Sequence, residues 1–315
     1  MPFPIEDKLV IAVSSSAVFD MIAADRIFQD EGEDAYRKYQ KDNLAVPFDK
    51  GIAFPFIKRL LRLNEVYPDV QPIEVIVLSR NDPDSGQRFY RSCKSHGLAI
   101  TRGAFLNGKD PYPYISAFNA ALFLSANERD VRSGVEAGMP AGLVLPTEAT
   151  DDDTDLELRV AFDFDGVVAD DEAETVYQES KDLGLFHQSE ADKVEIPHNP
   201  GPLSDLIRKM AVFQKWEKKR AKSSQDFKPA LRIAIVTARD APSNERMITT
   251  LNEWGLEAVE AFFLGGVEKR RVLEVLRPHI FFEDQLTHLA TAAAAVPSVH
   301  IPFGITNRPK LEHQP

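Results

Sequence analysis

The sequence predicts an α/β fold, in which a mainly parallel β-sheet is covered by helices on both faces. Short apolar runs of the kind that form buried strands alternate along the chain with segments of helical periodicity. Several of these runs end in polar or charged residues, and open parallel sheets bind their ligands beyond the carboxyl ends of the strands. A chain of 315 residues is long for one hydrophobic core, so we expect two domains or one elaborated domain.

The expected strands are apolar runs too short to be helices. They are residues 9–13, 73–78, 121–124, 142–145, 158–162, 231–236, 261–264, 280–282 and 298–301. The expected helices have apolar residues at helical spacing. They include residues 57–63, 87–96, 171–183, 203–220, 243–254 and 269–276.

The two halves of the chain run through the same order of features. Ser79 to Lys109 spans 30 positions, and Thr237 to Lys269 spans 32. We predict that one α/β unit has been duplicated; the alternative is that any two α/β halves resemble one another at this level. The matching segments are 11–20 with 160–169, 75–83 with 233–242, 104–111 with 262–269, and 121–127 with 280–285.

A polar and acidic run, residues 146–155, separates the two halves. We therefore predict an N-terminal α/β unit over residues 1–150 and a second domain over 156–315. In the second domain, 72 positions separate Asp165 from Thr237. We interpret residues 171–228 as an inserted helical cap.

Charge and cysteine content limit the partners and the compartment. The 49 acidic and 37 basic residues give a net charge of -12, which disfavours nucleic acids and anionic membranes. The single cysteine, Cys93, excludes an intramolecular disulfide and fits a reducing compartment. Because the sequence has neither a signal-peptide pattern nor a long apolar span, we expect a cytoplasmic protein.

Two carboxylates follow the expected strand 158–162 directly. Asp163 and Asp165 point the same way if the backbone stays extended, and Gly166 permits a sharp turn after them. Two converging carboxylates repel, and a divalent cation commonly resolves the repulsion. One carboxylate can then act as a nucleophile while the other handles a proton.

A second Asp-x-Asp pair, Asp153 and Asp155, lacks these supports. No apolar strand precedes it and no glycine follows it. We interpret residues 151–155 as a hydrated linker.

Other strand ends carry groups suited to a phosphorylated substrate. Thr237 and Arg239 follow one strand and offer a hydroxyl and a guanidinium, although Thr237 also suits a helix cap. Lys269 begins a helix, where an ammonium can neutralise phosphate or remain solvated. Glu283 and Asp284 end another strand with the oxygen ligands that Mg²⁺ prefers.

These four motifs, taken in order, resemble those of the haloacid dehalogenase-like superfamily of phosphoryl-transfer enzymes. The first motif is Phe-Asp-Phe-Asp-Gly-Val-Val at residues 162–168. The resemblance implies a Rossmannoid parallel sheet with a helical cap and an aspartyl-phosphate mechanism. Asp163 would attack phosphorus, and Asp165 would protonate the leaving alkoxide and then activate water.

The same resemblance implies functions for the remaining motif residues. Thr237 and Lys269 would hold the transferred phosphoryl group. Mg²⁺ would be held by the Asp163 carboxylate, the Asp165 backbone carbonyl and Asp284. The superfamily has Asp-Asp or Gly-Asp at the fourth motif, so the function of Glu283 stays open.

A narrower resemblance, to the cytosolic 5′-nucleotidase I family, covers nearly the whole chain. It implies Mg²⁺-dependent hydrolysis of nucleoside 5′-monophosphates, AMP prominently, to nucleoside and phosphate. The segments that carry it are residues 11–16, 79–81, 199–203, 213–215 and 279–285.

The first half lacks the catalytic carboxylates if the halves are homologous. Ser14 and Ser16 stand where the second half has its Asp pair, and Ser125-Ala126 stands where it has Glu-Asp. We predict a degenerate, non-catalytic unit that is a scaffold or binds an effector. Its strand-end residues, among them Ser15, Ser79, Arg80 and Asn81, suit a second anion or the framing of the substrate.

The cap supplies further candidates for substrate binding. Phe186, Phe213 and Trp216 suit stacking on a base, although aromatic residues at helical spacing also suit a core. Lys215 belongs to a basic cluster with Lys218, Lys219 and Arg220. No histidine receives a catalytic or metal-binding function. The candidate substrate-binding residues are Gly166, Arg239, Phe213, Lys215, Ser79 and Asn81.

Two other functions remain open from the sequence. The chain suits a phosphatase of sugar phosphates or other small phosphomonoesters, and it suits a non-catalytic nucleotide-binding regulator. A nucleotide effector and a homo-oligomer also remain open.

Overall fold

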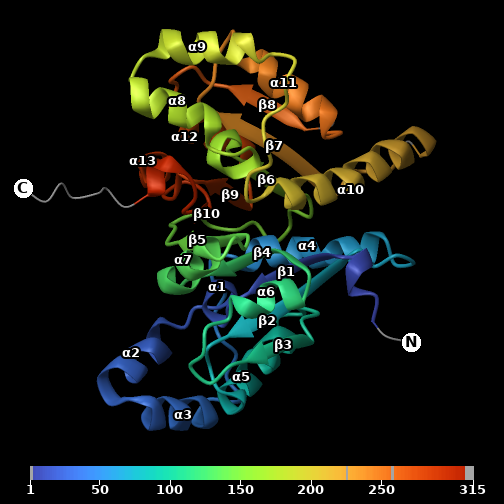
Figure 1. Cartoon of the computed structure of the whole chain (residues 1–315). Helices are drawn as coiled ribbons and strands as arrows, with labels where there is room; N and C mark the ends of the chain where they lie inside the picture. Colours follow the sequence, from blue (N-terminus) through green and yellow to red (C-terminus); the bar gives the residue numbers. More distant parts are fainter. Residues whose placement is uncertain (1–2, 225, 257–258, 309–315) are drawn as a thin grey trace, which may run out of the picture. The chain divides into compact units, whose positions relative to one another are not determined.

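The computed structural model describes residues 3–224, 226–256 and 259–308 (Figure 1). The chain forms two compact units. Unit 1 comprises Met1–Pro146 and Thr150–Leu158, and unit 2 comprises Thr147–Ala149 and Arg159–Pro315. Each has a mainly parallel sheet with helices packed against it, which confirms the predicted α/β class.

In unit 1 the strands lie in the order β3-β2-β1-β4-β5, and all neighbours pair in parallel. The strands are β1 (Leu9–Val13), β2 (Ile73–Ser79), β3 (Arg102–Phe105), β4 (Ala120–Ser125) and β5 (Ala141–Leu145). The helices are α1 (Ser15–Val18), α2 (Ile22–Glu31), α3 (Glu33–Asp42), α4 (Phe54–Val66), α5 (Pro83–Ser95), α6 (Pro113–Ala117) and α7 (Glu128–Glu136), with a 3-10 turn at Ile5–Asp7.

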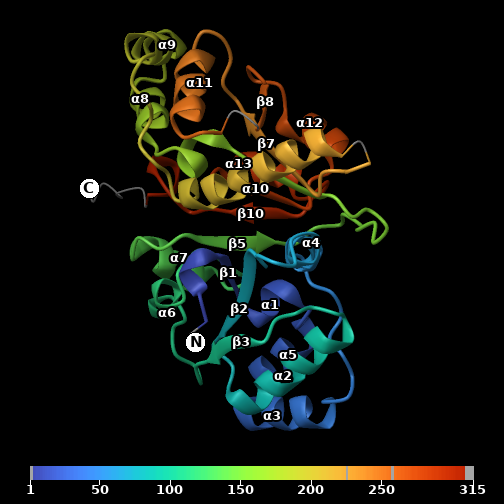
Figure 2. The same cartoon turned by 90° about the vertical axis from the view of Figure 1, so that its right-hand side faces the viewer.

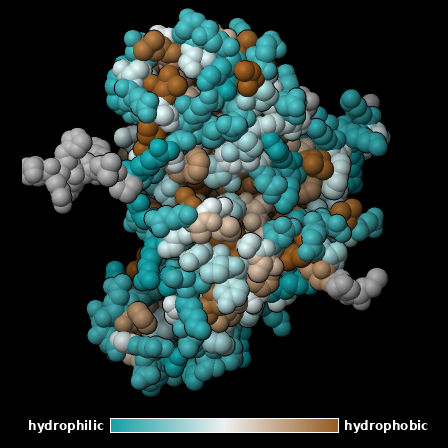
Figure 3. All heavy atoms as spheres, viewed as in Figure 1, coloured by the Kyte–Doolittle hydropathy of each residue, from teal (hydrophilic) through white to brown (hydrophobic). Residues whose placement is uncertain are grey.

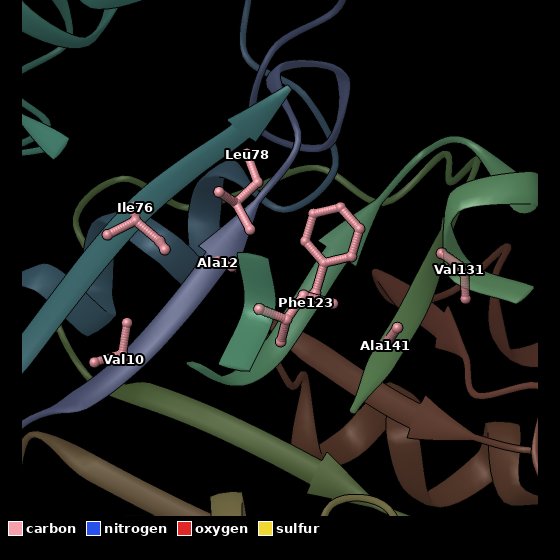
Figure 4. Packing of buried hydrophobic residues seen from close by; sticks show 8 residues of the cluster. Val10, Ala12, Ile76, Leu78, Phe123, Val131 and Ala141 are labelled. Carbon is pink, nitrogen blue, oxygen red and sulfur yellow. The ribbon is translucent and has the colours of Figure 1, made fainter. Parts of the chain in front are cut away.

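Both faces of the unit 1 sheet are buried. Val10, Ile76 and Phe123 pack against Ile115 of α6 and Val131 of α7, as Figure 4 shows for most of the cluster. The residues between them in the strands are equally buried. Successive side chains of a strand point to opposite faces of the sheet. Because all of them are buried, helices cover both faces of this sheet.

In unit 2 the strands lie in the order β10-β9-β6-β7-β8. They are β6 (Leu158–Phe162), β7 (Leu231–Thr237), β8 (Glu260–Phe263), β9 (Ile280–Glu283) and β10 (Ser298–His300). The other elements are a π-type turn at Phe164–Val168, α8 (Glu172–Ser180), α9 (Leu183–Asp192), α10 (Ser204–Ser223), α11 (Asn244–Glu253), α12 (Lys269–Leu276), α13 (Leu286–Ala292) and a 3-10 turn at Ile305–Asn307.

The region predicted to be a cap contains helices of two kinds (Figure 2). Helices α8 and α9 pack on one another, and α9 also contacts α11. Helix α10 instead packs against β7 and buries Leu206, Ile207 and Met210. The pair α8–α9 therefore fits the description of a cap better than the whole of residues 171–228.

All the expected strands are present, and one strand is added. Strand β3 was not predicted. Its sequence, Arg-Gly-Ala-Phe, is short and has little apolar character, because the strand lies at the edge of its sheet. The two units share the same order of elements, since β1 to β5 correspond in sheet position to β6 to β10. A common origin of the units stays a prediction.

Residues 151–154 are exposed, which agrees with the interpretation of 151–155 as a hydrated linker, but the run is also held by ion pairs that were not predicted. It belongs to unit 1 and packs against α4. The buried Arg59 lies 2.9 Å from Asp151 Oδ1, and Asp153 lies 2.6 Å from Lys50 and 3.0 Å from Lys58. The basic face of α4 neutralises the run, a pairing across about ninety positions that the local sequence does not reveal.

Surface hydrophobicity is scattered on the face seen in Figure 3, where hydrophobic residues form small groups among hydrophilic ones. Within the described residues, every helix is too short or too polar to cross a membrane.

Candidate active site

The central feature of unit 2 is a group of buried charged side chains at the carboxyl ends of neighbouring strands. Asp163 follows β6, and its backbone N–H donates to Phe282 O of the adjacent β9 at 2.8 Å. Its carboxylate accepts a hydrogen bond from Phe164 N at 2.7 Å. Only 4 % of Asp163 is exposed, so its carboxylate is held in one place by two strands and the turn that follows.

Lys269 supplies the positive charge of this group. Its Nζ lies 2.8 Å from Asp163 Oδ2 and 2.7 Å from Glu283 Oε2. Burial alone would lower the pKa of Lys269, but the charges of both carboxylates outweigh burial and raise it. Lys269 is therefore a fixed cation beside two carboxylates, and its function in holding a phosphoryl group stays a prediction.

The function of Glu283, which the sequence left open, follows from its contacts. Its Oε2 meets Lys269 and lies 3.2 Å from His288 Nδ1, and its Oε1 accepts from Gln285 N at 3.0 Å. Burial works against the ionised form, but the Lys269 charge and the His288 hydrogen bond prevail and lower the pKa of Glu283. Glu283 thus positions the lysine.

No histidine received a function from the sequence, but the structure places His288 beside the buried charged group. It lies on the first turn of α13, and its nitrogen, one Glu283 oxygen and one Asp163 oxygen lie within 4.8 Å of one another. The five positions that separate it from Glu283 give no recognised motif, so the sequence carried no signal for this contact.

The Asp284 carboxylate is the group at this site that most clearly lacks a partner within the described residues. Its Oδ2 accepts from Thr306 Oγ1 at 2.9 Å, while its Oδ1 is buried without a hydrogen-bond partner among the described residues. Burial, together with the charges of Glu283 and Asp163, raises the pKa of Asp284 to about 10. A carboxylate in this state is costly unless a cation compensates it.

Gly166 allows the turn after β6 to approach Asp284. Its φ is +71°, and a Cβ there would lie 2.7 Å from Asp284 Cγ. A side chain at position 166 would therefore displace the Asp284 carboxylate. Gly166 acts here through space and backbone conformation rather than through a substrate-binding side chain.

Two sets of ligands for a divalent cation can be compared. The set of Asp163, Glu283 and His288 is geometrically close, but the Lys269 ammonium already lies between the two carboxylates. The predicted set of Asp163, Asp165 and Asp284 includes the oxygen without a partner. The buried Asp284 oxygen without a partner fits a cation, and it belongs to the predicted set.

Asp165 is held by Arg239 through a two-pronged ion pair. Arg239 Nε donates to Asp165 Oδ2 at 2.8 Å, and Nη2 donates to Oδ1 at 2.7 Å. The guanidinium also donates to Ser243 O at 3.0 Å and to Glu190 of α9. Because most of its N–H donors bind protein atoms, Arg239 is suited to positioning Asp165 as well as to binding a substrate.

The ion pair continues into a buried network that joins α9 to the sheet. Glu190 accepts from Arg246 at 2.9 Å, and His198 Nε2 lies 3.1 Å from Glu190 Oε2. His198 Nδ1 lies 3.0 Å from Thr250 Oγ1. The network thus links α9 and α11 to the carboxylate that the sequence predicted as acid and base.

The pKa of Glu190 gives a test of this network. Burial alone would raise that pKa, but the His198 hydrogen bond and the Arg239 charge outweigh it and lower it from 4.5 to about 2. As the pH falls, Glu190 is therefore protonated in the unfolded chain before it is protonated in the folded protein. The network contributes its full stabilisation of the fold above about pH 5 and loses it toward pH 2. We expect urea unfolding to show a loss of about 2 kcal/mol over this range.

Glu190→Gln should be less stable at pH 7 and should lack that part of the pH dependence. Glu195→Gln, an exposed change on the following loop, should leave the curve unchanged. Equal pH profiles for Glu190→Gln and the wild type would contradict the assigned contacts.

The remaining predicted site residues lie in several places. Thr237 is buried at the end of β7, and its Oγ1 accepts from Arg239 N at 3.2 Å. Phe213 is 5 % exposed and packs against Trp216 on α10, which favours the core alternative, and we leave it out of the proposed site. Lys215 lies on the same helix near Gly255. Ser79 and Asn81 line a cavity of unit 1.

Comparisons with known proteins fit the geometry of unit 2. Residues 1–308 match a protein family described as 5′-nucleotidase. The chain is 35 % identical over 299 residues to cytosolic 5′-nucleotidase 1B of Homo sapiens, a match that covers 92 % of this chain. It covers 48 % of that protein, so the chain spans about half the length of this relative.

Among solved structures, histidinol dehydrogenase from Elizabethkingia anophelis matches 88 % of this chain and 72 % of its own at 8 % identity. Its TM-score of 0.22 is too low for the fold or the function to be inferred from it. The match along nearly the whole sequence carries the assignment: this chain belongs to the 5′-nucleotidase family.

Proposed function

We propose that the chain hydrolyses nucleoside 5′-monophosphates of the AMP type to nucleoside and phosphate, with Asp163 as the nucleophile. The observation that carries the proposal is the position of Lys269 against Asp163 at the carboxyl end of β6. An ammonium fixed beside a buried carboxylate can hold a phosphoryl oxygen while the carboxylate approaches phosphorus. Family membership supports the substrate class.

The reaction runs in two steps. An Asp163 oxygen forms a bond to phosphorus as the bond from phosphorus to the nucleoside 5′ oxygen breaks, and Asp165 donates a proton to that oxygen. Asp165 then takes a proton from water as the water attacks the phosphoaspartate, which releases phosphate and restores Asp163. Thr237 and Lys269 hold the phosphoryl oxygens throughout.

Mg²⁺ is the cofactor that we propose for this site. Asp163, the Asp165 carbonyl and Asp284 would hold it, and it would supply positive charge to neutralise the phosphoryl group. The Asp284 oxygen without a partner supports this choice. Thr306 and Asn307 brace Asp284, since they donate to its carboxylate and its backbone carbonyl at 2.9 Å.

Equivalent contacts support the proposal that unit 1 is a degenerate repeat of unit 2. Arg88 of α5 donates from Nε to Val46 O and from Nη1 to Gln40 Oε1. Arg246 of α11 donates in the same way to Ile196 O and to Glu190 Oε1. A shared arrangement at corresponding positions is harder to explain by α/β architecture alone than a shared strand order.

The compartment that we propose is the cytoplasm, where nucleotides are abundant and Cys93 stays reduced. Cys93 is buried, and burial raises the pKa of its thiol to about 12. A thiol in that state is unreactive, so we do not propose Cys93 as a nucleophile.

The test is phosphate release from a panel of nucleoside 5′-monophosphates and sugar phosphates, each with Mg²⁺ and with EDTA. We expect AMP-type substrates to be preferred and EDTA to abolish turnover. Asp284→Asn should need much more Mg²⁺ for half-maximal activity, because it removes one charged ligand.

The other functions that the sequence left open predict different results. A preference for sugar phosphates would favour the general phosphatase. Tight nucleotide binding without turnover would favour the regulator. Full activity in EDTA would contradict the metal site while leaving the substrate class open.

A further inference from the structure

Unit 1 has its own cavity at the carboxyl ends of β1, β2 and β4. Its volume of about 660 Å³ lies in the range of small-molecule sites. Ser14, Ser79 and Ser125 line it at the three strand ends, and Phe28 of α2 and Tyr36 of α3 line it from the helices. Open α/β sheets bind ligands at this position, yet no residue of the proposed catalytic group lines this cavity.

Two hydroxyls at this cavity are buried without partners in the described part of the chain. They are Ser15 Oγ, on a residue 2 % exposed, and Tyr36 Oη, on a residue 5 % exposed. A buried hydroxyl without a partner costs free energy, so such groups are rare unless a ligand or water satisfies them. Both residues line the cavity, so a ligand there can supply the missing hydrogen bonds.

The charges around the cavity disfavour a phosphorylated ligand. The lining residues include four carboxylates and only two guanidiniums, a net charge of -2, counted as two minus four. A phosphate dianion would be repelled unless one cation were available to it. The charged lining residues are Asp25, Glu33, Asp82, Asp130, Arg80 and Arg129.

Arg80, the half-buried cation of this set, is already engaged. Its Nε donates to Asp130 at 2.5 Å, its Nη1 donates to Gly108 O at 3.0 Å, and it pairs with Asp110. Asn81 occupies the strand-end position that Arg239 has in unit 2. Apart from the exposed Arg129, the cavity therefore offers hydroxyls, amides and carboxylates.

These polar groups are complementary to a sugar with several hydroxyls, and the cavity also has an aromatic wall. Phe28 and Tyr36 meet edge to face, with ring centroids 5.8 Å apart, and 52 % of Phe28 is exposed. An exposed aromatic face next to hydroxyls and carboxylates suits a planar base that carries a ribose. The four carboxylates of the lining would repel the phosphate of a nucleotide.

We propose that the cavity of unit 1 binds an uncharged nucleoside, with its ribose toward the strand-end serines and its base against Phe28. The assignment follows from the side chains of unit 1 and does not depend on catalysis in unit 2. If unit 2 also releases a nucleoside, unit 1 senses the product class.

The test is isothermal titration of the full chain with adenosine, cytidine and ribose. We expect the nucleosides to bind and ribose to bind at least tenfold more weakly. Ser15→Ala and Tyr36→Phe should each weaken nucleoside binding about three- to tenfold, the loss of one hydrogen bond. Because they remove hydroxyls without partners, neither should lower the unfolding temperature. Phe28→Ala should weaken binding at least as much.

Matched controls separate this site from the catalytic one. Ser116→Ala on α6 and Tyr90→Phe on α5 lie outside the cavity and should bind nucleosides like the wild type. Asp163→Asn should also bind them with unchanged affinity at this site, and it allows titration with AMP without turnover. Its failure to hydrolyse AMP would bear on the proposed function alone.

Four results would overturn the proposal. One is the absence of nucleoside binding up to millimolar concentration, and another is binding that Asp163→Asn removes and Tyr36→Phe leaves intact. The third is AMP binding that exceeds adenosine binding and depends on Ser15, which would make the cavity an anion site. Equal affinity for ribose and adenosine would exclude the base contact with Phe28 and thereby the nucleoside assignment.

Discussion

Replacing Asp163 by asparagine should reduce phosphate release from AMP by at least about a thousandfold, the scale expected when a nucleophile is removed. The fold should persist. Burial and the Glu283 charge raise the pKa of Asp163 well above its ordinary value, although Lys269 works against them. A neutral side chain of the same shape relieves this cost and still accepts from Phe164 N. Steady-state kinetics and thermal unfolding of one preparation would measure both effects.

Asp153→Asn is the matched control for that variant. Asp153 belongs to the other Asp-x-Asp pair of the chain, but it is bound by Lys50 and Lys58 on the surface of unit 1. Its loss should leave turnover unchanged. Wild-type activity in Asp163→Asn would exclude the covalent mechanism, and a comparable loss in Asp153→Asn would show that the two carboxylates act together.

The strands were predictable because a buried parallel strand is recognised from a short apolar run in its own sequence. Residues 73–78 and 231–236 are apolar runs interrupted only by Glu74 and Arg232, and each forms the expected strand. Their strand-end residues could be placed as well, since parallel strands bring their carboxyl ends to one edge. Asp163 and Glu283 are brought close through β6 and β9 for this reason.

The partners of those residues were less predictable, because they depend on side-chain directions across distant elements. Glu190 and Arg239 are 49 positions apart, and neither belongs to a recognised motif with the other. The same holds for Arg59 and the acidic run, where the charge pattern predicted the exposure of residues 151–154 but not the ion pair with a buried arginine. The sequence shows which residues are charged, but the pairing of distant charges depends on the fold.

Lys269→Met should destabilise unit 2 by about 3 to 5 kcal/mol, the cost of leaving buried carboxylates without their cation. Lys269 is 4 % exposed and lies between Asp163 and Glu283, so its loss leaves the ionised Glu283 without its cation in a space closed to water. Urea unfolding at pH 7 would measure the change. Arg270→Met, which breaks an exposed pair with Glu274 one position further on, should have no measurable effect.

A second substitution separates the stability of this group from its chemistry. Lys269→Met combined with Glu283→Gln removes one of the two carboxylates that the lysine neutralises, so it should recover at least half of the lost stability. Activity should not recover, because no ammonium remains to hold the phosphoryl group beside Asp163. If the double variant regained turnover with its stability, Lys269 would be a structural residue only. If Lys269→Met alone kept full stability, the buried group would have to be compensated by a cation other than Lys269.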